Sequence, residues 1–260
     1  MNFPPSQVIL PGQLLLVTDE LSSSADFLLH QIVCERLRSA KSGSGSGVTI
    51  LTMSGPEAGS RWKAIATKSG LTSGVVSSFL HFVDVCSDSD TPGGIAAVGS
   101  ASLKGCYDRL SSRLSQASQA AELIILDDIS TLEWIGYDIA DVQKFTRALV
   151  ALCRKAQAPL IIRHHVLCTS TREPIFTEDE SSDDLFNLLA QLASFHVEIK
   201  SLASGRSGSV SGEIALYHGP SLHNVEKSAV KAISRTSALQ YRLTDYSAVY
   251  FHRGTASGVL

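Results

Sequence analysis

The sequence predicts a three-layer α/β fold with a mainly parallel sheet that is completed by antiparallel strands near the C-terminus. Short apolar runs between turn residues, as at 14–17 and 123–126, are typical of strands buried on both faces. Amphipathic stretches of about 12 to 18 residues separate these runs and are long enough to connect parallel strands. From 195 onward, apolar and polar residues alternate between glycine-rich turns, which is typical of antiparallel strands.

The order of the expected elements follows from this periodicity. In the parallel part we expect strands at 14–17, 48–53, 78–85, 123–126 and 159–164, and helices at 25–41, 57–68, 103–120 and 138–155. Ser23 or Ser24 is the expected cap of the first helix, and Asp26 favours the positive end of its dipole. Antiparallel strands are expected at 195–202, 212–217 and 244–252. We expect one domain over 1–260, with flexible insertions near 42–47, 87–100 and 168–182.

Composition excludes several classes of protein. The formal net charge of −3 gives no overall attraction for nucleic acid, although it leaves room for a local basic patch. The apolar runs are far shorter than the roughly 20 residues that span a bilayer, so we expect no membrane association. The five cysteines have no CxxC or zinc-ligand spacing, which favours reduced thiols inside the cell and no metal site: Cys34, Cys86, Cys106, Cys153 and Cys168.

The turn after the first strand is where such a fold would hold nucleotide phosphates. Phosphate binding there needs the G-x-x-x-x-G-K-[ST] pattern of the Walker A loop, in which glycines expose backbone N–H groups and lysine supplies charge. The corresponding positions are Thr18, Asp19, Glu20, Leu21, Ser22, Ser23, Ser24 and Ala25. They include no glycine and no lysine, and two carboxylates would repel a triphosphate. The pattern is therefore that of a degenerate phosphate loop, and we expect no cofactor.

Asp127 and Asp128 follow four apolar residues, which is the form of a Walker B strand whose acid would hold magnesium. The alternative is that these aspartates begin the next turn or cap the next helix. Because the phosphate loop is missing, we expect a structural or vestigial role for the pair.

Other polar residues offer weaker signals. His164 and His165 should point to opposite faces of their strand, so a metal pair is not expected, and satisfied surface histidines are favoured over a binding role. Arg163, Lys200 and Arg206 are the candidate contacts to RNA. The segment 203–211 could be a phosphate-contacting loop or an ordinary hairpin turn, of which the turn is slightly favoured.

A parallel core completed by antiparallel strands is the plan of RecA-like, P-loop NTPase-like cores, and of several other three-layer folds. Specific segments extend the likeness. The chain resembles the Elongator complex protein 6 family in order along nearly its whole length, in LIILDDISTL at 123–132 with Gly136, in GQLLLV at 12–17 and FLLH at 27–30, and in YRLTD at 241–245 with VYF at 249–251, Gly254 and VL at 259–260.

That resemblance implies a specific role. Subunits 4, 5 and 6 of that family are RecA-like paralogues that form a hetero-hexameric ring with two copies of each. The ring joins the catalytic subunits 1, 2 and 3, which modify the wobble uridine (position 34) of tRNA, and it is credited with binding tRNA. The resemblance further implies a cytoplasmic protein, with the nucleus left open as a second location, and no catalytic residue of its own.

Two alternatives stay open at this point. One is an active ATPase of RecA or KaiC type with an unusual nucleotide site, which the turn at 18–25 argues against. The other is a free-standing regulatory module of the same fold, which would not recover paralogous ring subunits.

Overall fold

The computed structural model describes residues 3–43, 47–53, 56–86, 103–116, 121–166, 181–202, 210–222, 230–244 and 247–254. They fall into two compact units, each built from separated stretches of chain. The terminal unit comprises Met1–Val8, Leu15–Leu28 and His164–Leu260, and the central unit comprises Ile9–Leu14 and Leu29–Arg163. The expectation of one domain over 1–260 stays a prediction.

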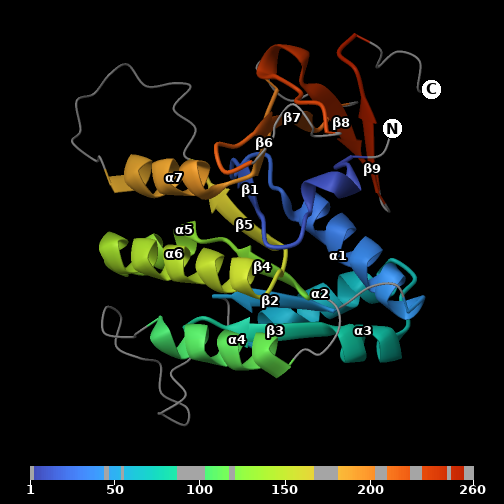
Figure 1. Cartoon of the computed structure of the whole chain (residues 1–260). Coiled ribbons are helices and arrows are strands. Elements are labelled where there is room, and N and C mark those ends of the chain that lie inside the picture. Colours follow the sequence, from blue (N-terminus) through green and yellow to red (C-terminus); the bar gives the residue numbers. More distant parts are fainter. Residues whose placement is uncertain are drawn as a thin grey trace. The chain divides into compact units, whose positions relative to one another are not determined.

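The central unit contains four parallel strands in the order β3-β2-β4-β5. Their bounds are β2 (Val48–Thr52), β3 (Leu80–Asp84), β4 (Leu123–Asp127) and β5 (Leu160–His165). All five residues of β2 and the first four of β4 are buried, because both faces of these strands are covered. The accompanying helices, seen in Figure 1, are α1 (Asp26–Lys41), which begins in the terminal unit, α2 (Pro56–Lys68), α3 (Ser73–Phe79), α4 (Lys104–Gln116), α5 (Ser130–Trp134) and α6 (Ile139–Lys155).

The terminal unit contains strands in the order β1-β6-β7-β8-β9. Strand β1 (Leu14–Asp19) runs parallel to β6 (Phe195–Lys200), and β7 (Gly212–His218), β8 (Leu239–Leu243) and β9 (Ala248–Phe251) follow as antiparallel neighbours. Helix α7 (Ser181–Leu192) precedes β6, and short 3₁₀ turns lie at η1 (Ser6–Val8) and η3 (Arg235–Ser237). Burial alternates along β6, with Phe195, Val197 and Ile199 turned to the core.

The predicted α/β plan is confirmed, with a parallel part completed by antiparallel strands. Three local expectations were wrong. Helix α3 occupies the start of the strand expected at 78–85. Helix α7, which was not expected, begins at the end of the insertion expected near 168–182 and buries Leu185, Leu188 and Leu189 at helical spacing. In place of one strand at 244–252 the chain makes the β8–β9 hairpin, whose first strand buries Leu239 and Tyr241.

The expected insertions mostly lie outside the described residues, namely 44–46, 87–100 and 168–180, and Cys168 lies there as well. In the described part of the chain, none of the helices has the length and apolar character needed to cross a membrane.

Candidate functional site

The turn after β1, which the sequence predicts to be a degenerate phosphate loop, is filled by side chains of the turn itself. Asp19 and Glu20 are buried, with 1% and 7% of their surface exposed. Thr18, the preceding residue of β1, hydrogen-bonds through its hydroxyl to Nε2 of His196 on β6 at 2.7 Å. A turn made to receive a ligand would leave its polar groups open, whereas these groups are turned inward.

The carboxylate of Asp19 lies at the beginning of α1. Its Oδ2 accepts the backbone N–H of Ala25 at 2.6 Å, and its Oδ1 lies 2.5 Å from Nδ1 of His165. Next to it, Ser24 Oγ accepts the backbone N–H of Asp26 at 3.1 Å, which confirms one of the two expected caps. The N–H groups at a helix N-terminus are what a P-loop offers to a phosphate. Here Asp19 supplies the anion at this end of α1.

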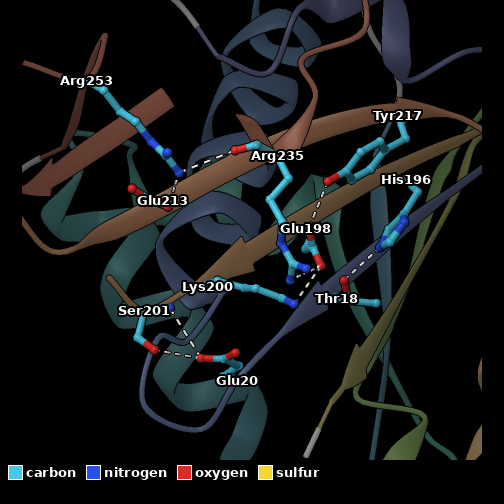
Figure 2. Close-up of polar contacts among 10 residues, drawn as sticks. All are labelled: Thr18, Glu20, His196, Glu198, Lys200, Ser201, Glu213, Tyr217, Arg235 and Arg253. Atoms are coloured by element: carbon cyan, nitrogen blue, oxygen red, sulfur yellow. Dashed lines mark hydrogen bonds and ion pairs between the residues drawn. The ribbon is translucent and has the colours of Figure 1, made fainter. Parts of the chain in front are cut away.

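Glu20 ties the turn to the end of β6. Its Oε2 accepts hydrogen bonds from Ser201 Oγ at 2.8 Å and from the Ser201 backbone N–H at 3.2 Å, as Figure 2 shows. Ser22 Oγ donates to the same oxygen at 3.4 Å, and the Ser23 backbone N–H donates to the Glu20 carbonyl at 2.8 Å. Leu21 and Ser22 are the exposed residues of this turn, and Leu21 has 70% of its surface exposed.

Ser23 ties the turn to β8. Its hydroxyl lies 2.8 Å from the hydroxyl of Tyr241, a buried side chain that also stacks on Phe27 of α1. A Cβ at Gly212 would stand 2.8 Å from Ser23 Oγ and 2.7 Å from both the Tyr241 hydroxyl and the Lys200 carbonyl. Glycine is therefore the residue that fits where β7 passes the turn.

The Walker-B-like pair lies in the central unit, and its two residues have different partners. Asp127 Oδ1 forms an ion pair with Nη1 of Arg163 at 3.1 Å. Asp128 has a φ of 74°, a conformation that aspartate tolerates better than most residues. Its carboxylate accepts the Ser130 backbone N–H at 3.0 Å and the Thr131 hydroxyl at 2.7 Å. Asp128 thus shapes the turn into α5, and the vestigial role of the pair stays a prediction.

The two adjacent histidines point to different neighbours, as strand alternation predicts. His165 faces Asp19, while His164 is buried and stacks on Phe186 of α7 with ring centroids 6.2 Å apart. The expectation of surface histidines was wrong for His164, because α7 packs against it. No group of three or more potential metal ligands occurs within the described ranges.

A second polar cluster covers the side of β6 opposite its buried residues. We call this side, which carries His196, Glu198 and Lys200, the polar face of the terminal sheet. Glu198 accepts hydrogen bonds from the Tyr217 hydroxyl at 2.9 Å and from Arg235 Nη2 at 3.3 Å, and it forms an ion pair with Lys200 Nζ at 2.9 Å (Figure 2). Burial, and then the hydrogen bond to Glu198, raise the pKa of Tyr217 to about 12, so its hydroxyl stays a donor. On the same face, Arg253 Nη2 lies 2.6 Å from Glu213 Oε2.

The family model for Elongation complex protein 6 matches residues 95–245, which is more than half of the chain. The chain belongs to the Elongation complex protein 6 family. No curated protein matches it in sequence at a significant level.

The fold of this Elongation complex protein 6 family member is also that of a solved protein. The crystal structure of the RadB recombinase matches with a TM-score of 0.52 at 16% identity, covering 92% of this chain and 91% of that one. At this identity the likeness shows the RecA-like fold alone. Membership of the family implies that this chain is a subunit of the Elongator complex.

The residues predicted to contact RNA have three different placements in this Elongation complex protein 6 family member. Arg163 is buried and paired with Asp127, Lys200 is part of the polar face, and Arg206 lies outside the described residues. Sequence reasoning missed Glu198 and Tyr217, and it did not include Arg235 and Arg253 among the candidate contacts. The alternation of His196, Glu198 and Lys200 along β6 was the one available signal.

Proposed function

We propose that this chain is a non-catalytic structural subunit of the Elongator complex, joining paralogous subunits 4 and 5 in a hetero-hexameric RecA-like ring. In this proposal the ring binds tRNA and supports modification of the wobble uridine of tRNA by subunits 1, 2 and 3. The chain works in the cytoplasm, with the nucleus as a second location to be tested by imaging.

The family match over residues 95–245 is the observation that carries this proposal. The RecA-like fold supports it, because a ring of paralogues requires a shared scaffold. The degenerate turn supports the non-catalytic part. Asp19 accepts the Ala25 N–H where a phosphate would be held, and Glu20 is engaged by Ser201, so the turn is already closed by internal hydrogen bonds.

Affinity purification of the tagged full-length chain from its native cells, followed by mass spectrometry, tests the assembly. We expect Elongator subunits 4 and 5 in amounts matching the bait, and subunits 1, 2 and 3 in lower amounts. Recovery of the folded chain without subunits 4 and 5 would contradict the proposal and favour a free-standing module.

An active RecA- or KaiC-like ATPase with a degenerate nucleotide site is the second candidate, favoured by the Asp127-Asp128 ending of β4. A ligand that binds only the folded state raises its stability, by about 2.7 kcal/mol at a hundred times its dissociation constant. We expect Mg-ATP to leave the melting temperature unchanged relative to magnesium chloride alone. A reproducible rise with Mg-ATP would favour the ATPase.

A further inference from the structure

The polar face of the terminal sheet extends in register across all four of its later strands. Lys200 lies opposite Glu213, Glu213 opposite Gln240, and Gln240 opposite Phe251. Residues that pair directly across strands have side chains on the same face of a sheet. These four side chains therefore form one row across the sheet, and Arg242 with Val249 begins the next row.

This face carries more positive than negative charge. Lys200, Arg235, Arg242 and Arg253 bring four cations to it, against the two carboxylates of Glu198 and Glu213, an excess of two in a chain whose formal net charge is −3. The side chains of Arg235 and Arg253 are 60% and 46% exposed.

The two arginines keep donor groups for a ligand. Each uses one terminal nitrogen on its glutamate, and Arg253 shares that nitrogen with the Arg235 carbonyl at 3.3 Å. Figure 2 shows Arg235 between Arg253 and Glu198. A guanidinium has five N–H donors in a planar fork that matches a phosphate. The Glu198 and Glu213 side chains are only 17% exposed, so the ion pairs stay in place while a phosphate binds the remaining N–H donors on the exposed side of each arginine.

The row also offers a surface for stacking. Phe251 is half-buried at the β9 end of the row, beside the arginine-bearing turn at Arg253. Unpaired nucleic-acid bases stack on aromatic side chains while arginines hold the neighbouring phosphates. Proteins that bind single-stranded RNA commonly place cations beside an aromatic ring on the surface of a sheet.

A protein partner would need a different surface. Interfaces between proteins are centred on well-packed apolar or aromatic anchors. In the described part of the chain, the exposed large apolar side chains are Leu21, Trp134 and Leu243. Leu21 lies in the turn after β1 and Trp134 in α5. Leu243 alternates with Arg242 and so faces away from the polar face.

We propose that the polar face of the terminal sheet binds a single-stranded segment of RNA, with Arg235, Arg253 and Lys200 on its phosphates and Phe251 under a base. This proposal rests on the proposed function, in which RNA is the substrate of the complex. It adds which surface of this subunit binds the RNA, and that the RNA is bound in single-stranded form.

The test measures binding of the full-length chain, with the subunits that co-purify with it, to a fluorescent single-stranded RNA of about 12 nucleotides. The first variant carries Arg235→Gln and Arg253→Gln together. We expect its affinity to fall about tenfold and its salt slope to shrink by about 1.4, since each phosphate contact to a single strand contributes about 0.7. The second variant, Phe251→Leu, should weaken binding about tenfold with an unchanged salt slope.

Lys144→Gln is the matched control, because Lys144 is an exposed cation on α6 that pairs with its own aspartate, Asp141, at 2.9 Å. It should bind RNA as the unchanged chain does. Unchanged RNA affinity in both polar-face variants, with circular dichroism showing them folded, would overturn the proposal. Equal weakening by Lys144→Gln would overturn it too, since binding would then depend on charge alone.

Two further outcomes separate this proposal from the proposed function. Loss of the co-purifying subunits with RNA affinity intact would make this face a protein interface, which overturns the RNA proposal and leaves the Elongator role standing. If no Elongator subunit co-purifies while Arg235→Gln and Arg253→Gln still weaken RNA binding, the proposed assembly fails and the RNA surface stands.

Discussion

Asp19 and Ala25 are joined across the turn after β1, where the carboxylate accepts the backbone N–H at 2.6 Å. The anion at the beginning of α1 thus belongs to the chain itself, and its other oxygen faces His165. This relationship holds the turn in place through groups of the chain itself. It also makes the turn a contributor to stability.

Replacing Asp19 by Ala should destabilise the protein by about 2 to 4 kcal/mol, because the Ala25 N–H and His165 lose a buried charged partner. Urea unfolding of the full-length chain measures this difference. Glu35→Ala on α1 is the control, because Glu35 is exposed and its carboxylate accepts a hydrogen bond from Gln31 of the same helix. The effect of this substitution should stay within about 0.5 kcal/mol. An Asp19→Ala variant as stable as the control would show that the turn is held by other contacts.

Gly212→Ala should destabilise the protein by about 3 kcal/mol or more, because the added Cβ would stand 2.7 Å from the backbone oxygen of Lys200. Gly74→Ala in α3 is its counterpart, since nothing lies within 4 Å of a Cβ built there. That variant should gain up to about 1 kcal/mol from helix propensity. Melting temperatures of the two variants should therefore move in opposite directions, and a shared direction would contradict the packing described for Gly212.

Acid should destabilise the terminal unit through His196. Burial lowers the pKa of His196 to about 4, with Glu198 raising it and His164 lowering it further. In the unfolded chain this histidine takes up a proton near pH 6.5, so between pH 4 and 6.5 the unfolded state binds more protons and stability rises with pH. The stability that comes from keeping His196 neutral is fully present above the pKa of this histidine in the unfolded chain. About 2 kcal/mol of that stability should be lost between pH 7 and pH 5.

His196→Gln isolates this effect, because glutamine can still reach the Thr18 hydroxyl and does not titrate. The variant should lose less stability than the unchanged chain when urea unfolding is repeated from pH 7 to pH 5. Parallel pH dependences in the two proteins would assign the acid sensitivity to other groups.

We expect Asp128 to stabilise the protein through its backbone conformation and through the hydrogen bonds that its carboxylate accepts. Asp128→Asn keeps a side chain that tolerates a φ of 74° and can accept from Ser130, so its cost should stay below about 1 kcal/mol. Asp128→Val should cost about 3 kcal/mol, because a β-branched residue is strained there and both hydrogen bonds are lost. Thermal unfolding ranks the two, and similar losses would point to the charge of Asp128 as its contribution.

The parallel core was readable from the sequence because each buried strand is an uninterrupted apolar run, as in β2 and β4. Helix α3 was not predicted because its segment, SGVVSSF, is short and contains two β-branched valines and a glycine, so tertiary contacts decide its conformation. The absence of lysine and glycine from the turn after β1 could likewise be seen in the sequence. The partners that fill the turn were not, because Ser201 lies 181 residues from Glu20 and only the fold brings them together.

The pairing of β1 with β6 has a consequence for synthesis. Thr18 and its partner His196 are 178 residues apart, and most of the terminal unit is encoded after the whole central unit. At translation speeds of about 5 to 20 residues per second, the first strand waits on the order of ten seconds for its neighbour. During that time LLLV of β1 is an apolar strand without its β6 partner. We therefore expect the nascent chain to depend on chaperones more than a protein whose first strand pairs locally, and slower elongation should increase that dependence.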